Sequence, residues 1–68
     1  MNIYLFESYV QETKERENVG VIAENYKKAE ELMIKVIKEN QLFSFINVIP
    51  LKGISEKAVE MMFPIVKD

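Results

Sequence analysis

Two runs of apolar residues open the chain and are separated by a short polar segment. Residues 2–10 contain no Gly or Pro and are rich in β-branched and aromatic side chains, which is typical of a strand. The segment 11–18 carries five charges and predicts an exposed hairpin tip whose arms can extend the strands on either side. Residues 19–23 predict a second strand, in which Gly20 indicates either a bulge or the close approach of another backbone.

From Asn25 onward the apolar period changes from two residues to about 3.6, which predicts a long amphipathic helix. Asn25 is a suitable N-cap, because its side chain can accept a hydrogen bond from a free amide of the first turn. Ile34 is turned away from the apolar side. The apolar stripe consists of Tyr26, Ala29, Leu32, Met33, Val36 and Ile37.

Residues 41–51 predict a third strand in which both alternating sets of side chains are largely apolar. Pro50 has no amide hydrogen, so the strand either ends there or lies at the edge of a sheet. Ser55 can cap a short helix over residues 56–63, and Pro64 makes its continuation unfavourable. Ile65 and Val66 are compatible with a small extra strand or with a packed tail.

The order of these elements predicts one α+β domain over residues 1–68, with a three-stranded sheet in β-β-α-β-α order. The long helix would cover one face of the sheet, and the short helix follows the last strand. The hairpin makes the first two strands antiparallel. The third strand pairs either parallel to the second through a right-handed crossover or antiparallel to the first.

The composition excludes several kinds of chemistry. The chain has no Cys and no His, so thiol nucleophiles, imidazole bases and the usual zinc ligands are absent, and we expect no enzyme activity, metal or cofactor. A net charge of -2 argues against general nucleic-acid binding. No apolar stretch approaches the roughly 18 residues of a membrane span, and no signal peptide is recognisable. We therefore expect a soluble cytoplasmic protein, in the host cytoplasm if the protein is viral.

The apolar surface predicts self-association. At 49% hydrophobic residues, the chain has more apolar strand surface than one long and one short helix can readily cover, which favours a homodimer or higher oligomer. The alternative is a monomer in which the second helix covers the remaining face completely. The expected interface residues are Tyr4, Phe6, Phe43, Phe45, Ile49, Met61, Met62 and Phe63.

A second candidate site lies at the start of the long helix. Lys27 and Lys28 beside free backbone amides would suit a phosphate group, and Tyr26 would stack on a base. Lys14 and Arg16 would approach from the hairpin of a neighbouring subunit. This set would bind a nucleotide, although ordinary solvated lysines explain the same residues more simply, and no phosphate-binding glycine motif is present.

Four further polar residues interrupt or flank the strands. Glu7 and Glu24 would in principle hold a divalent cation, but neither lies near an Asp cluster, so edge or solvent-facing carboxylates are the better interpretation. Ser44 and Asn47 each interrupt an apolar strand. For these two, an internal hydrogen bond is a better interpretation than contact with a ligand.

The strand Val19-Gly-Val-Ile-Ala-Glu runs directly into the helix Asn25-Tyr-Lys-Lys-Ala-Glu-Glu-Leu, and an antiparallel strand from Met1 precedes it. Over residues 1–50 this pattern resembles small proteins encoded by bacteriophages and other mobile elements. The resemblance implies a protein that acts stoichiometrically, either by blocking a host enzyme or by sequestering a signalling nucleotide. Composition and apolar surface thus predict a non-enzymatic, oligomeric interaction protein, and the resemblance implies that it is a viral inhibitor of a host defence factor, with a nucleotide-sequestering protein as the alternative.

Overall fold

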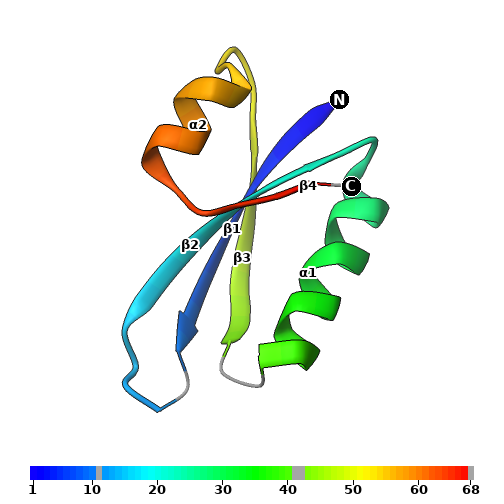
Figure 1. Cartoon of the computed structure of the whole chain (residues 1–68). Helices are drawn as coiled ribbons and strands as arrows, with labels where there is room; N and C mark the ends of the chain where they lie inside the picture. The colour runs from blue at the N-terminus through cyan, green and yellow to red at the C-terminus, as the bar shows by residue number, and fades with distance from the viewer. Residues whose placement is uncertain (11, 41–42, 68) are drawn as a thin grey trace.

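The computed structural model describes residues 1–10, 12–40 and 43–67, without the side chains at positions 10, 40 and 43–46. Within these ranges the chain forms a mixed sheet with a helix on each face (Figure 1). The elements in chain order are β1 (Asn2–Val10), β2 (Arg16–Ala23), α1 (Tyr26–Asn40), β3 (Phe43–Leu51), α2 (Glu56–Met62) and β4 (Ile65–Lys67).

The sheet has the strand order β3-β1-β2-β4. The long third strand pairs antiparallel to β1, which decides between the two pairings that the sequence allowed. The sheet has four strands where three were expected. Residues 65–67, for which the sequence allowed a small extra strand or a packed tail, form a strand parallel to β2. Helix α2 ends at Met62, one residue earlier than expected, since Phe63 has an extended backbone with φ -139° and ψ 155°.

Helix α1 covers the face formed by the even-numbered residues of β1. Asn25 caps this helix by accepting a hydrogen bond from the Lys28 amide at 2.9 Å, as its sequence position predicts. Ile34 is 39% exposed, which confirms that it lies off the apolar stripe. The core beneath the helix consists of Phe6, Val19, Val21, Ala23, Ala29 and Met33, all buried.

Helix α2 packs on the opposite face, over one half of the sheet (Figure 1). Its Val59 is buried against Ile3 and Ile22, in a second, smaller core. The Ser55 hydroxyl caps the helix by accepting a hydrogen bond from the Ala58 amide at 3.2 Å. The predicted cap is confirmed, and the helix is held near the end of the sheet where β1 begins.

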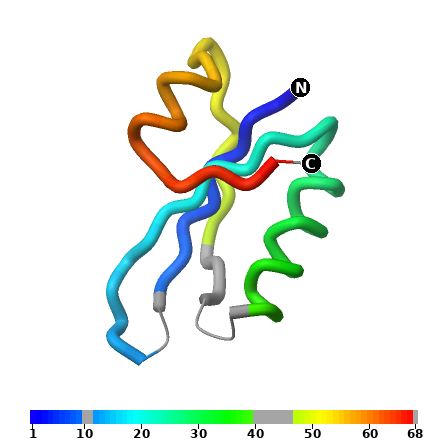
Figure 2. The backbone as a smooth tube through the Cα atoms, in the orientation of Figure 1, coloured from blue at the N-terminus to red at the C-terminus, as the bar shows by residue number. Residues whose placement is uncertain are grey.

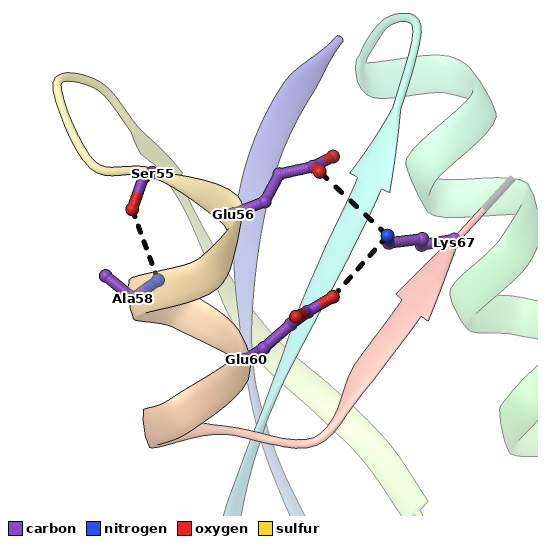
Figure 3. Close-up of polar contacts among 5 residues, drawn as sticks. All are labelled: Ser55, Glu56, Ala58, Glu60 and Lys67. Atoms are coloured by element: carbon purple, nitrogen blue, oxygen red, sulfur yellow. Dashed lines mark hydrogen bonds and ion pairs between the residues drawn. The ribbon is translucent and has the colours of Figure 1, made fainter.

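An ion-pair group links α2 to β4. The ammonium of Lys67 lies 3.4 Å from a carboxylate oxygen of Glu60 and 3.9 Å from one of Glu56 (Figure 3). All three side chains are about half exposed, so water and salt screen the pairs and each contributes only about 0.2–1 kcal/mol. These contacts therefore orient β4, and burial of Val59 supplies more of the stability.

Gly20 is the point where β2, β4 and α2 come together. Its amide donates to the Pro64 carbonyl oxygen at 2.9 Å. A Cβ atom at this position would lie 2.8 Å from Cδ1 of Ile65 and 2.9 Å from Cγ1 of Val59. Of the two interpretations that the sequence allowed, a bulge or a close approach, the structure supports the close approach, because the register with β1 is regular here.

We expect Gly20→Ala to lower the free energy of unfolding by about 1–3 kcal/mol, because the added methyl group overpacks this contact. Chemical denaturation measures the change. Ile65→Val provides the control, since it removes Cδ1, one of the two atoms in the way. The decrease in the free energy of unfolding caused by Gly20→Ala should be smaller in the Ile65→Val background than in the parent chain. An equal cost in both backgrounds would contradict this explanation.

Candidate interaction surface

The half of the second sheet face that α2 does not cover forms a surface of mixed character. Its members follow from the strand register, in which Leu5 pairs with Gly20 and Ile49, Glu7 with Asn18 and Asn47, and Tyr9 with Arg16. Residues that pair directly across antiparallel strands lie on the same face. We call this surface the open face and define it as Leu5, Glu7, Tyr9, Arg16, Asn18, Asn47 and Ile49.

A polar row crosses the open face from β3 to β2. The side-chain amide of Asn47 donates to Oε1 of Glu7 at 3.0 Å, while Oδ1 of Asn47 accepts from the Val48 amide at 2.9 Å. The hydrogen bonds predicted for Asn47 are therefore present, although the residue is exposed. At the other end of the row, Oδ1 of Asn18 is buried and has no hydrogen-bond partner among the described residues. The row thus retains an unused acceptor.

The structure separates the residues that we expected at an interface. Phe6 is completely buried beneath α1, so it is a core residue and not part of an exposed surface. Tyr4 is half-buried against the same core, and Phe63 against the smaller one. Ile49 lies on the open face and is 38% exposed, while Met61 and Met62 on α2 are 83% and 67% exposed. The side chains of Phe43 and Phe45, like that of Ser44, lie outside the described part of the chain.

The residues of the expected nucleotide site lie in two places. Tyr26, Lys27 and Lys28 are exposed in the first turn of α1, whereas Lys14 and Arg16 lie at the hairpin end of β2. The eight residues from Arg16 to Ala23 span roughly 23 Å of strand, seven steps of about 3.3 Å. One protomer therefore does not bring the five together, and the site stays a prediction that requires a second subunit.

Tyr26 is occupied by contacts within the chain. Its ring meets the ring of Tyr4 edge to face, with centroids 5.9 Å apart, and its hydroxyl donates to Oε2 of Glu30 at 3.1 Å. The hydrogen bond to the carboxylate raises the pKa of Tyr26 above 10.0, with smaller contributions from desolvation and from the negative charge of Glu30. Stacking on a base would have to displace or supplement these contacts.

The two glutamates that we considered for a cation lie far apart. Glu24 follows Ala23, the register partner of Asn2. Glu7 lies five residue steps further along β1, a separation of roughly 17 Å. Among the described residues there is no group of three potential metal ligands and no pocket. None of the described helices is both long and apolar enough to cross a membrane.

Comparison of the chain with known protein families, curated proteins and solved structures finds no match.

We expect Glu30→Gln to lower the pKa of Tyr26 toward 10.0, because the acceptor loses its charge. The ring signals of Tyr26 followed by NMR through an alkaline titration measure this change, and Glu31→Gln is the matched control. Because the folded-state pKa is raised, this contact stabilises the fold fully below about pH 10. That stabilisation is lost as the pH rises through the raised pKa. An unchanged midpoint in Glu30→Gln would show that the hydrogen bond is not maintained in solution.

Proposed function

We propose that the chain is a non-enzymatic interaction protein that associates with a second copy of itself through the open face. The observation that carries this proposal is the incomplete cover of the sheet, since α2 packs over only one half of the face opposite α1. The uncovered half combines the apolar groups of Leu5, Tyr9 and Ile49 with a polar row, a mixture that is common in interfaces between folded proteins.

Charge favours a second copy as the partner. Each open face carries one carboxylate, Glu7, and one guanidinium, Arg16, two positions apart along adjacent strands. When two such faces pack around a two-fold axis with their strands antiparallel, Arg16 of each copy approaches Glu7 of the other. An isologous contact therefore pairs the charges, and the same patch serves both partners.

The available area indicates a weak dimer. The open face spans the width of three strands and about four residues along each strand, which gives a projected area on the order of 200 Å². A standard interface buries about 800 Å² per partner. The accessible surface of the chain is 4711 Å², close to the roughly 4450 Å² of a compact monomer of 8.0 kDa. We infer that folded monomers associate reversibly.

Within this proposal, inhibition of a host factor by a phage or mobile-element protein is the biological role that we favour. It is supported by the pattern over residues 1–50 and by a composition without Cys or His. In this role the protein would act stoichiometrically, by occupying a surface of its target.

Ile49→Lys should weaken self-association at least about tenfold, because dimerisation would then bury an unpaired charge. Sedimentation velocity between about 1 µM and about 1 mM measures the dissociation constant. Ile54→Lys is the matched control: Ile54 is 43% exposed, similar to Ile49 at 38%, but it lies in the segment between β3 and α2, away from the open face. A monomer at all concentrations in the parent chain, or equal effects of the two variants, would contradict the proposal.

The charge pairing has its own test. Arg16→Glu and Glu7→Arg should each weaken the dimer, because each variant places like charges in contact. The double variant should recover most of the lost affinity, because it restores one acid and one base on every face. Additive losses in the double variant, measured by sedimentation, would exclude the antiparallel arrangement of the two faces.

A further inference from the structure

We propose that the outer edge of β2 from Arg16 to Val19 is a strand-addition site for an extended segment of another protein. This edge lies between the hairpin and the point where β4 begins. The edge presents backbone groups and adjoins the open face, with which it shares Arg16 and Asn18, but the inference does not depend on self-association. It rests on the direction of the backbone groups, on the state of the opposite edge and on the charges beside the strand.

The backbone direction follows from Gly20. Its amide donates to Pro64 at 2.9 Å and therefore points away from β1. In an antiparallel ladder this direction repeats every second residue, so the amides and carbonyls of Asn18 and Arg16 also point outward. The pairing of β4 starts at Gly20 with Ile65 and runs toward Ile22, so β4 does not reach them. No described segment lies beside this part of β2 (Figures 1 and 2).

The opposite edge of the sheet is closed over the C-terminal half of β3. The same alternation directs the amides of Asn47 and Ile49 toward β1 and position 48 outward. The Val48 amide is bonded to Oδ1 of Asn47 at 2.9 Å, and Pro50, two residues later, has no amide hydrogen. A capped donor and a proline are devices that protect edge strands from pairing. The β2 edge has neither between Arg16 and Val19.

The charges beside this edge decide what kind of strand it accepts. Glu17 lies on the α1 side, opposite Ser8, while Arg16 and Asn18 lie on the open-face side. An antiparallel pair formed with the same edge of a second copy must keep like faces together, which brings Glu17 opposite Glu17, Glu15 or Val19 of that copy. The register with Val19 also places Arg16 opposite Gly20, where β4 is already paired, so only the two registers with a glutamate opposite Glu17 are open. Like charges directly opposite each other are destabilising. The fitting partner is therefore an extended segment with basic side chains on the α1 side.

The open-face side adds a requirement for a small hydrogen-bond donor. Oδ1 of Asn18 is buried without a described partner and lies beside this edge. Because this oxygen is buried, the Asn18 side chain has to rotate toward the edge before a threonine or serine hydroxyl of an added strand can donate to it. The partner thus alternates basic residues with short polar ones, and its main chain supplies the donors and acceptors that pair with Arg16 and Asn18.

The test uses the full chain, labelled with ¹⁵N, and a blocked six-residue peptide in which lysine alternates with threonine. The Arg16 and Asn18 amide signals should shift with added peptide, and their hydrogen exchange should slow about tenfold at saturation, while the Gly20 amide stays unchanged. Two control peptides carry N-methyl groups on alternate sets of amides. In the first peptide the methyl groups replace the amide hydrogens that face β2, and its affinity should fall at least tenfold. In the second peptide they replace the amide hydrogens that face away from β2, and its affinity should be retained.

Variants separate main-chain pairing from other contacts. Asn18→Pro removes an outward amide without breaking the ladder to β1, and should abolish binding, whereas Asn18→Ala keeps the amide and should weaken binding only by the loss of the one side-chain hydrogen bond. Glu17→Lys should reverse the preference toward a peptide of alternating glutamate and threonine. If circular dichroism shows Asn18→Pro unfolded, the methylated peptides decide the question.

The strand-addition site would be overturned by unchanged amide signals at millimolar peptide or by equal binding of both methylated peptides. Concentration-dependent protection of the Asn18 amide without peptide would show a second copy at this edge, and would overturn the assignment of a foreign partner. Loss of the open-face dimer in Ile49→Lys should leave peptide binding intact, so the two surfaces are tested separately.

Discussion

The position of β1 between two antiparallel neighbours is the constraint on which the rest of the structure depends. Since its side chains alternate, its even-numbered residues lie beneath α1 and its odd-numbered residues lie on the other face. The paired residues of β2 follow the same division. Because only the seven residues of α2 cover the second face, the molecule has one closed face and one that is half open. Both proposed surfaces arise from this asymmetry and from the short span of β4.

Local patterns in the sequence predict most of the elements. The caps at Asn25 and Ser55 and the exposed Ile34 follow from period and residue type alone. The sequence allowed the hairpin arms to extend the strands, but the start of β2 at Arg16 does not follow from the pattern, because it depends on cross-strand pairing of a mostly polar segment with Tyr9. Strand β4 is only three residues long, too short for a periodic signal. The register shift of β3 beside Glu7 and Ser8 also lacks a glycine or proline that would indicate it.

The candidate surface was harder to predict than the elements, because both faces of the first strand are apolar. Nothing in the period alone shows that Phe6 lies under the long helix. Glu7 could have shown which face of the first strand is uncovered, because a carboxylate is seldom fully buried. Leu5 and Tyr9 share the face of Glu7, but they were not among the expected interface residues. Asn18 was also missed, because its role depends on a register that pairs it with Glu7.

The parallel pairing of β4 gives the last part of the chain an importance beyond its size. A polypeptide that stops after α2 lacks Pro64 and Ile65, so the Gly20 amide loses its acceptor and the uncovered margin of β2 lengthens from four residues to eight. A long unprotected margin invites assembly into fibres or amorphous aggregates. On the ribosome the same situation exists until residues 64–67 emerge. Pairing of β4 is therefore the step that shortens this exposed edge to the four residues of the proposed strand-addition site.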